Sequence, residues 1–305
     1  MRVAVFGATG EQGVAQVSAL TAANHTPIAV SRRPTLTGEA TVETRLADFN
    51  DLDAVRAAIN GVDAVFLNLP SFQPPEPLIA AARVIGREAT KQPSLKLIVL
   101  NTSMPVPEKS ANIETQEDRR EIRRVLREET ELSGVSVVSI QPVVYLDNLL
   151  SGWMLHRLRD EGRIVYCHKP DLEVSWISHD DLAALMVAAL TRDPKDLDGR
   201  DIPVGGPETV RLSQLAEQLS TAWGREVGYE SQSVKDFATE FSERIGDAMA
   251  GLEKEGVVDE MRRAYAWYNN AEEKPFRVDM GPVLEVLPAK LTSIEAWGRR
   301  KGSPF

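Results

Sequence analysis

Three glycines near the start of the chain are spaced so that they could hold a phosphate group. Gly7, Gly10 and Gly13 follow an apolar run, residues 2–6, that is typical of a strand, and residues 13–23 have the apolar spacing of a helix. In such a turn the first glycine permits the bend, the second lets the backbone approach a pyrophosphate, and the third lets the helix pack against the strand. The N–H groups at the start of the helix then attract the anion. The residues predicted to bind a dinucleotide here are Gly7, Thr9, Gly10, Glu11, Gln12 and Gly13.

The end of the second predicted strand indicates which dinucleotide is bound. A site for NAD usually has an acidic residue there, about 20 residues past the glycines, to hold the ribose hydroxyls. This chain instead has Ser31, Arg32, Arg33 and Pro34. A carboxylate would repel a 2′-phosphate, whereas a hydroxyl and two guanidinium groups attract it. The sequence therefore favours NADP(H) over NAD(H), although Arg33 is also explained as a solvated loop residue.

Other candidate cofactor contacts follow the third to sixth predicted strands, at the edge where open α/β sheets bind ligands. Asp48 could accept a hydrogen bond from the adenine amino group beside Phe49, or it could cap the following helix, a role for which Asn50 competes. The backbone after the fourth strand would pass the second ribose. The further residues predicted at this edge are Asn68, Leu69, Pro70, Asn101, Pro142 and Val143.

The elements that must position these residues alternate regularly through the first half of the chain. Short runs rich in valine, isoleucine and leucine predict strands that are covered on both faces, and segments with helical spacing separate them. Strand, helix and strand in repetition predict a doubly wound parallel sheet, an α/β fold of the Rossmann type. The predicted strands are residues 2–6, 26–31, 41–46, 63–67, 95–100 and 135–140, and the predicted helices are residues 13–23, 52–59, 77–90 and 117–132.

The pattern changes in the second half of the chain. Residues 182–190 and 212–223 still have helical spacing, and residues 200–204 could add a last strand. Beyond Gly228 the chain is polar and helical, without the strand–helix rhythm. The expected dinucleotide-binding Rossmann domain comprises residues 1–150 with 179–204 returning to it, and the expected smaller C-terminal α/β domain, for a substrate or a partner, comprises residues 151–178 and 205–305.

The composition disfavours several classes of protein. The 305 residues carry a formal net charge of −10 and no long basic block, which disfavours direct binding to nucleic acid. No apolar run approaches the roughly 20 residues that a membrane span needs, and the first residues lack the pattern of a signal peptide. Cys167 is the only cysteine, so no intrachain disulfide can form, and we expect it to be a packing residue. We therefore expect a cytoplasmic protein that binds neither nucleic acid nor membrane.

Motifs in a fixed order along nearly the whole chain point to a known family. They are GATGEQG, SRRP, ADFNDLDAV, NTSMP, SGVSVVSIQPVVYLDN, HDDLAALMVAAL, GGPETVRLSQLAEQLSTAWGREVGY and LTSIEAWGRR. Together they resemble the NmrA-like atypical short-chain dehydrogenases. The resemblance implies a Rossmann domain, a small C-terminal domain and a nicotinamide dinucleotide in the cleft. That family contains NADPH-dependent reductases of quinones, phenylpropanoids and related carbonyls or alkenes, and also dinucleotide sensors that regulate other proteins.

The resemblance also implies catalytic residues from which this chain departs. Short-chain dehydrogenases generally use a Tyr-x-x-x-Lys pair, in which the lysine lowers the pKa of the tyrosine so that it can pass a proton while hydride moves. None of the five tyrosines here has a lysine four residues later. Reductases of the NmrA-like group often keep a lysine about ten residues before the small-Gly step, here Ser133 and Gly134, and that count reaches Arg123. An arginine stays charged and cannot readily give up its proton.

Three side chains are candidates for catalytic roles, each with a simpler alternative. Arg123 could hold a ribose hydroxyl or polarise a carbonyl, but it lies in a charged run that usually forms a solvated helix. Arg119 and Arg123 both flank the apolar stripe of that helix. Ser103 could orient a substrate or cap a turn. Tyr145, just past the sixth strand, could donate a proton or only wall the pocket.

The remaining candidates have weaker signals. His156 and His168 fall where a pocket cover is expected, although lone histidines are more often packing or surface residues. The triplet His179-Asp180-Asp181 looks like a metal site but is explained by the start of a helix, so no metal is predicted. The aromatic cluster at residues 265–268 could stack an aromatic substrate or belong to the core.

Two functional hypotheses follow from these observations. The favoured one is an NADPH-dependent oxidoreductase that reduces a quinone, enone or carbonyl small molecule. The alternative is a catalytically inactive NADP(H)-sensing regulator that binds a partner protein. The missing Tyr-x-x-x-Lys pair favours the sensor, whereas the C-terminal region with its aromatic cluster favours the reductase. A sugar-nucleotide epimerase is a weaker third hypothesis because it relies on the same pair. The sequence leaves the oligomeric state open.

Overall fold

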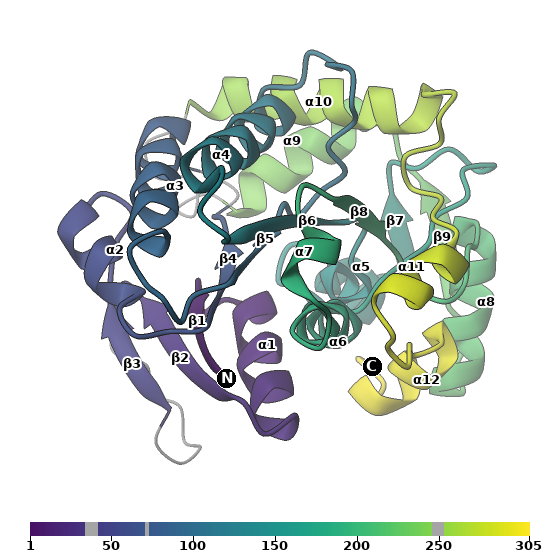
Figure 1. Ribbon diagram of the computed structural model, residues 1–305. Coiled ribbons are helices and arrows are strands. Elements are labelled where there is room, and N and C mark those ends of the chain that lie inside the picture. The colour runs from purple at the N-terminus through teal and green to yellow at the C-terminus, as the bar shows by residue number, and fades with distance from the viewer. Residues whose placement is uncertain (34–41, 71–72, 246–252) are drawn as a thin grey trace.

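A seven-stranded sheet forms the centre of the computed structural model, which describes residues 1–33, 42–70, 73–245 and 253–305 (Figure 1). Pro34 in the predicted phosphate-binding stretch and Thr41 at the expected start of the third strand lie outside the described residues. The strand order is β3-β2-β1-β4-β5-β6-β8, and every pairing is parallel. The strands are β1 (Arg2–Phe6), β2 (Thr26–Ser31), β3 (Glu43–Leu46), β4 (Ala64–Asn68), β5 (Leu97–Asn101), β6 (Ser136–Pro142) and β8 (Asp201–Val204).

The predicted α/β fold with a doubly wound sheet is confirmed. Every residue of β4, β5 and β6 is buried, because both faces of these strands are covered. The expected last strand is present as β8, beside β6. The chain order reverses at β1, which pairs with β2 on one side and β4 on the other. Such a reversal opens a crevice at the carboxyl ends of the strands, where dinucleotides bind.

Helices cover both faces of the sheet (Figure 1). One apolar cluster joins the sheet to α2, α3 and α4 through Val55, Ile85 and Leu126. A second cluster joins it to α1 and α6 through Leu20 and Leu182. These helices are α1 (Glu11–Ala22), α2 (Leu52–Ala58), α3 (Pro75–Ala89), α4 (Glu114–Thr130) and α6 (His179–Ala189), and the short α7 (Pro194–Leu197) precedes β8.

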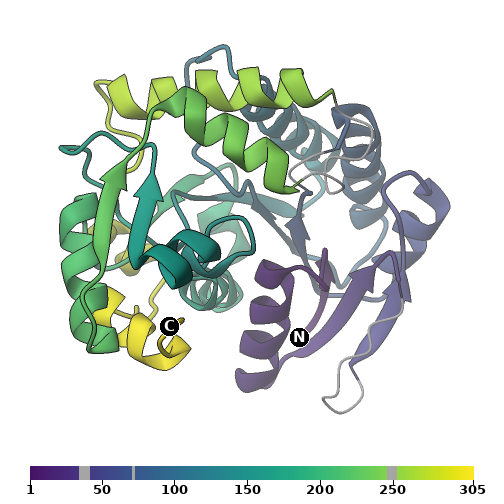
Figure 2. The same cartoon turned by 180° about the vertical axis from the view of Figure 1, so that it is seen from behind.

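The remaining elements pack beside the carboxyl edge of the sheet and at its β8 end (Figure 2). A two-stranded parallel sheet pairs β7 with β9, and α9 packs against α10. The cluster that contains Val3 of β1 also contains Tyr166 of β7, so the core is continuous between the two sheets. The expected division into two domains stays a prediction. These elements are η1 (Leu146–Leu150), α5 (Leu155–Glu161), β7 (Arg163–Tyr166), α8 (Leu212–Trp223), β9 (Gly228–Ser231), α9 (Val234–Ile245), α10 (Lys254–Asn270), α11 (Met280–Val286) and α12 (Ile294–Lys301).

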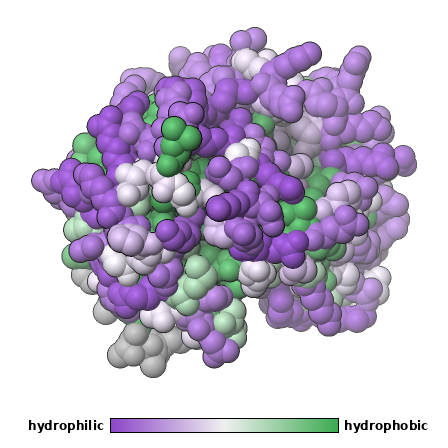
Figure 3. Space-filling view, viewed as in Figure 1, coloured by the Kyte–Doolittle hydropathy of each residue, from purple (hydrophilic) through white to green (hydrophobic). Residues whose placement is uncertain are grey.

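The face of the molecule in Figure 3 is mostly hydrophilic, and its hydrophobic side chains form small separate groups. Exposed large apolar side chains among the described residues, such as Val14, Leu46 and Leu132, lie far apart in the sequence. No helix in the described part of the chain is long and apolar enough to cross a membrane.

Candidate cofactor and acceptor site

The glycine turn between β1 and α1 has the close packing that its spacing predicts. Gly7 has a φ of +70°, a conformation that side chains rarely adopt. A Cβ on Gly13 would lie 2.2 Å from the carbonyl oxygen of Gly7, so only glycine lets α1 approach the turn. A Cβ on Gly10 would meet only that oxygen, at 3.4 Å, and Gly10 lines an open cavity. The turn therefore leaves room for a diphosphate at the start of α1.

A cavity of about 1060 Å³ extends from this turn to helix α10. Most of the residues predicted to contact a cofactor line it. Three do not: Asn101 is fully buried behind the wall, Pro142 is buried within β6, and Arg33 lies outside on the surface. The predicted cofactor residues that line the cavity are Gly7, Thr9, Gly10, Glu11, Gln12, Gly13, Ser31, Arg32, Asp48, Phe49, Asn68, Leu69, Pro70 and Val143.

We call the part of the cavity beside the glycine turn the cofactor end. The ends of β2 and β3 form its far wall. The Ser31 hydroxyl donates to the Arg33 carbonyl oxygen at 2.6 Å and so shapes the loop, while the exposed Arg32 lines the cavity. Asp48 accepts from both the backbone and side-chain nitrogens of Asn50. Neither of these two caps α2, because Asp51 is the cap and accepts from the Ala54 backbone N–H. The helix-capping alternative for Asp48 was therefore wrong, and its carboxylate stays at the cavity wall.

A network of buried amides fixes the floor of the cofactor end. Asn68 Nδ2 donates to the Phe6 carbonyl oxygen at 2.8 Å and to Gln16 Oε1 at 2.7 Å. Asn101 Nδ2 donates to Asn68 Oδ1 at 2.9 Å and to Gln12 Oε1. Gln16 is fully buried one helical turn beyond Gln12, and sequence analysis missed it because a buried glutamine leaves no periodic signal. Asn101 thus acts from behind the wall by holding Gln12 and Asn68.

Two of the three catalytic candidates meet at Gln12. The Tyr145 hydroxyl donates to Gln12 Oε1 at 3.2 Å, and the Ser103 hydroxyl donates to the same oxygen at 3.4 Å. Both residues line the cavity. Burial raises the pKa of Tyr145 well above its ordinary value, and no lysine or arginine among the described residues contacts its hydroxyl. Its hydroxyl is therefore a hydrogen-bond donor that no cation in the described part of the chain makes more acidic.

His179 completes this side of the wall. Its ring packs edge-on against Tyr145 with the ring centroids 4.6 Å apart, and its backbone N–H donates to Asp147 Oδ2. Burial lowers the pKa of His179 despite the nearby carboxylates of Asp147 and Glu11. The helix α6 is capped by Ser178 rather than by the triplet, and no group of three potential ligands for a metal occurs in the parts of the chain that the structure describes.

The structure corrects the role proposed for Arg123. Arg123 does not line the cavity, because its Nη1 pairs with Asp201 Oδ2 at 2.7 Å, and Arg127 pairs with the same carboxylate. Arg123 is buried, so it is not a solvated helix residue either, and it ties α4 to β8. One helical turn earlier, Arg119 does line the cavity and donates from Nη2 to the Pro70 carbonyl oxygen at 2.9 Å. Of these two arginines, Arg119 and not Arg123 lines the cavity.

The far end of the cavity is lined by aromatic rings. Trp153 packs edge-on against Phe241 and Phe237, with ring centroids 5.0 and 5.7 Å apart. Both Tyr265 and Tyr268 of the predicted cluster line the cavity, whereas Trp267 does not. His168 lies behind this wall, where complete burial lowers its pKa to about 3, so it is a packing residue. The aromatic residues that line this end are Trp153, Tyr166, Phe237, Phe241, Tyr265, Tyr268 and Phe276.

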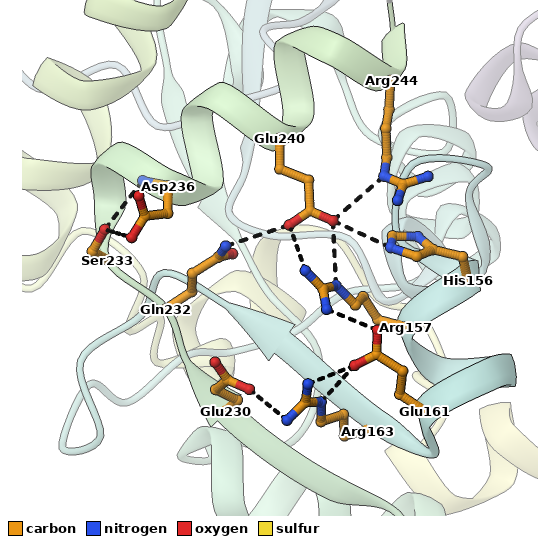
Figure 4. Close-up of polar contacts among 10 residues, drawn as sticks. All are labelled: His156, Arg157, Glu161, Arg163, Glu230, Gln232, Ser233, Asp236, Glu240 and Arg244. Carbon is orange, nitrogen blue, oxygen red and sulfur yellow. Dashed lines mark hydrogen bonds and ion pairs between the residues drawn. The ribbon is translucent and has the colours of Figure 1, made fainter.

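A cluster of charges holds α9 against α5 at this end (Figure 4). The Glu240 carboxylate accepts two hydrogen bonds from Arg157, contacts Arg244, and lies 3.2 Å from His156 Nε2. Because Phe237 and Phe241 are on the same helix, these contacts keep their rings beside the cavity. His156 therefore anchors the cover without lining the cavity itself.

Carboxylates gather near α4 and α10, and the sequence analysis assigned none of them a role. Glu260 accepts from both the backbone N–H and the hydroxyl of Thr115 and pairs with Arg263. Asp118 also lines the cavity, and burial raises its pKa to about 6. Two members of this group, Glu114 and Asp118, are the first and fifth residues of α4, so the sequence shows them only as part of a polar helix face. The carboxylates that line this part of the cavity are Glu114, Asp118, Glu253, Asp259 and Glu260.

A parallel sheet with a glycine turn at its point of reversal and a long cavity at its carboxyl edge defines a Rossmann-type dinucleotide-binding protein. The NmrA-like family model matches residues 1–297, and the chain belongs to the NmrA-like family, as its motifs predicted.

Similar proteins include enzymes and a regulator. The (4-alkanoyl-5-oxo-2,5-dihydrofuran-3-yl)methyl phosphate reductase of Streptomyces griseus is 32% identical over 235 residues, which are 76% of this chain and 77% of that protein. The NADPH-dependent quinone oxidoreductase QOR2 of Escherichia coli, solved with NADPH, has a TM-score of 0.73 and 20% identity over 98% of this chain and 99% of its own. NmrA, a negative transcriptional regulator solved with NADP, has a TM-score of 0.65 and 17% identity over 98% and 94%. These neighbours agree with the predicted NADP(H) cofactor.

Proposed function

We propose that the protein is an NADP(H)-dependent reductase that transfers hydride to a flat conjugated acceptor such as a quinone or an enone. The observation that carries this proposal is the continuity of the cavity from the glycine turn to an aromatic-lined end. A dinucleotide sensor needs the first end alone, whereas a reductase needs room for a second molecule beside the cofactor. A volume of about 1060 Å³ provides room for both.

The residues of the cofactor end fit NADP(H). Gly10 leaves the start of α1 open to a diphosphate, and the glycine turn cannot accept a larger residue at Gly13. Arg32 lines the cavity at the end of β2, where a 2′-phosphate would need a cation. When bound, the cofactor would supply the hydride, and Asn68 and Gln12, held by buried amides, would give it a rigid floor.

The aromatic end fits a flat acceptor. Rings of Phe237, Phe241 and Trp153 offer apolar surfaces on which a conjugated ring system can stack, and the cluster around Glu240 holds α9 in place. Between the two ends, the hydroxyls of Tyr145 and Ser103 can donate hydrogen bonds to an acceptor oxygen in exchange for Gln12 Oε1. The activities of the dihydrofuranone phosphate reductase and of the quinone oxidoreductase support this class of acceptor.

The proposal is tested by NADPH oxidation with a panel of neutral quinones, enones and aldehydes. The wild-type protein should oxidise NADPH with at least one conjugated acceptor, and Gly10→Val should remove this activity because it blocks the cofactor. Oxidation that is equal in the wild type and in Gly10→Val would come from another source and would contradict the proposal.

The second candidate function is an NADP(H)-sensing regulator. Two observations favour it: no cation among the described residues contacts the Tyr145 hydroxyl, and Arg123 does not line the cavity. The structural similarity to the regulator NmrA is in line with it. A sensor predicts that no acceptor in the panel oxidises NADPH, while NADP⁺ binding changes protease sensitivity or the capture of a partner protein.

A further inference from the structure

Asp118 differs from the other carboxylates of the cavity. It lies in the second turn of α4, half-buried at the cavity wall. Glu114 and Glu260 nearby are both paired with Arg263. Asp118 makes no hydrogen bond and no ion pair with any residue that the structure describes, so its carboxyl group is available to a molecule in the cavity.

Arg119, the next residue, supplies an independent sign of a ligand at the same place. Its side chain is 3% exposed and lines the cavity. Nη2 donates to the Pro70 carbonyl oxygen, but the buried Nε has no partner among the described residues. A buried guanidinium N–H without an acceptor costs free energy. Because Arg119 lines the cavity, a small rotation of its side chain would let an oxygen of a bound molecule satisfy this N–H.

We propose that Asp118 is the proton donor of the reduction and that the guanidinium of Arg119, after a small rotation that frees Nε, holds an oxygen of the acceptor beside it. This inference rests on the proposed reductase function. The acceptor gains a hydride at carbon while NADPH becomes NADP⁺, and the electron pair of the acceptor's conjugated bond moves to its oxygen. The proton of the Asp118 carboxyl group then passes to that anion. The carboxylate is left beside the charged Arg119 and regains a proton from water at the cavity mouth.

The charges that face Asp118 suit it to this role. Burial raises its pKa to about 6, and Arg119 opposes that rise. Glu114 of α4, Glu260 of α10 and Glu76 of α3 raise the pKa further through repulsion. An acid whose pKa lies near neutrality can both hold and release a proton under ordinary conditions, which Tyr145, with its raised pKa, does less readily.

The decisive experiment compares pH profiles of the wild type, Asp118→Asn and the control Glu121→Gln. Glu121 is on the same helix, outside the cavity, and pairs with Arg124. The probe is menadione, or the best acceptor of the panel. In the wild type, kcat/KM should fall about tenfold per pH unit above about pH 6, because only protonated Asp118 donates. Asp118→Asn should be slower by about 10²–10⁴-fold near pH 5.5 and independent of pH, with unchanged NADPH affinity. Glu121→Gln should match the wild type.

A second measurement, of thermal stability against pH, does not depend on enzyme activity. Because the folded-state pKa of Asp118 lies above its ordinary value, the folded protein binds the proton more tightly, and the free energy of unfolding falls as the pH rises from about 4 to about 6. Asp118→Asn removes this loss, so its Tm should exceed that of the wild type at about pH 8 and approach it near pH 4.

The outcomes separate the two proposals. If kcat/KM falls above about pH 6 in both the wild type and Asp118→Asn, the role of Asp118 is overturned while the reductase function stands. A Tm difference between the two proteins that does not change with pH would have the same meaning. A wild type that reduces no acceptor would overturn the reductase and, with it, the role of Asp118. A fall of kcat/KM above about pH 6 that is present in the wild type and lost in Asp118→Asn supports both the reductase function and the role of Asp118.

Discussion

The two ends of the cavity differ in which atoms form their walls. At the cofactor end, backbone and neutral amide groups shape the wall. The glycine turn leaves space for a ligand, and the side chains of Asn68, Asn101 and Gln12 form hydrogen bonds with one another. At the end proposed for the acceptor, side chains form the wall, and they are mostly aromatic rings and carboxylates, many of them from α9 and α10. A wall of backbone fixes one ligand closely, whereas a wall of side chains can be changed residue by residue. We infer that cofactor choice and acceptor choice can be altered separately.

The largest expected effect is a loss of NADPH affinity from a substitution at the cofactor end alone. Gly10 has an extended backbone that any residue can adopt, so Gly10→Val should fold normally while its side chain blocks the diphosphate. NADPH affinity should fall by at least about a hundredfold, or about 2.7 kcal/mol, as measured by calorimetry. Gly13→Ala is the contrasting variant, because its Cβ would lie 2.2 Å from the Gly7 carbonyl oxygen and should disturb the fold itself. Native affinity in Gly10→Val would place the cofactor elsewhere.

The next effect concerns which dinucleotide the cofactor end prefers. Arg32→Asp replaces an attraction for the 2′-phosphate by a repulsion, so NADPH affinity should drop about 10- to 100-fold while NADH affinity stays within a few fold. Arg33→Asp is the matched control, because Arg33 does not line the cavity. Equal affinities of the wild type for NADPH and NADH would show that Arg32 does not select the cofactor.

Tyr145→Phe tests the boundary between the two ends. If the hydroxyl orients the acceptor through one neutral hydrogen bond, kcat/KM should fall by about tenfold with NADPH affinity unchanged. A loss of about 10²–10⁴-fold would instead identify Tyr145 as the proton donor. The size of the loss, measured by steady-state kinetics, therefore distinguishes orientation from proton transfer.

A smaller effect is expected from the aromatic wall. Phe241→Leu keeps an apolar side chain but removes the ring that packs against Trp153, so KM for a naphthoquinone should rise by about threefold to tenfold. NADPH affinity should not change. Phe305→Leu serves as the control, because Phe305 contacts Trp223 and Arg225 away from the cavity. A change in NADPH affinity of Phe241→Leu would show that the two ends are not independent.

The smallest effect on function is expected from Arg123→Ala. Removing the contact with Asp201 should lower the Tm but leave NADPH affinity and turnover unchanged, because Arg123 does not line the cavity. Thermal unfolding and calorimetry on one preparation check both statements. A fall in cofactor affinity without a fall in Tm would restore the role that the sequence suggested.

The same contrast explains how much could be predicted from the sequence. The parallel sheet, the glycine turn and Arg32 were predictable because each depends on neighbours within a short stretch of chain, whose apolar spacing and turn residues are visible. The end proposed for the acceptor draws Trp153, Phe241 and Tyr265 from three distant parts of the chain, and no local pattern brings them together. Only Tyr265 was singled out, as part of an aromatic cluster.

The α4 residues show why the rest was missed. Arg119 and Arg123 are one helical turn apart and flank the same apolar stripe, so spacing alone could not tell which one faces the cavity. The difference is set by tertiary partners, the Pro70 carbonyl oxygen for Arg119 and the Asp201 carboxylate for Arg123. Asp118 gave no signal because its importance lies in burial and in the absence of a partner among the described residues, neither of which a sequence displays.

The most direct test of the proposed function is the transfer of deuterium from NADPH labelled at C4 of the nicotinamide ring. The acceptor that is consumed fastest in the panel is incubated with each of the two C4-deuterated forms, and the product is analysed by mass spectrometry. The proposed arrangement of cofactor and acceptor in one cavity predicts deuterium at carbon in the product from one form only, because the acceptor would meet one face of the ring. Oxidation of NADPH that leaves the product unlabelled with both forms would contradict hydride transfer in this cavity.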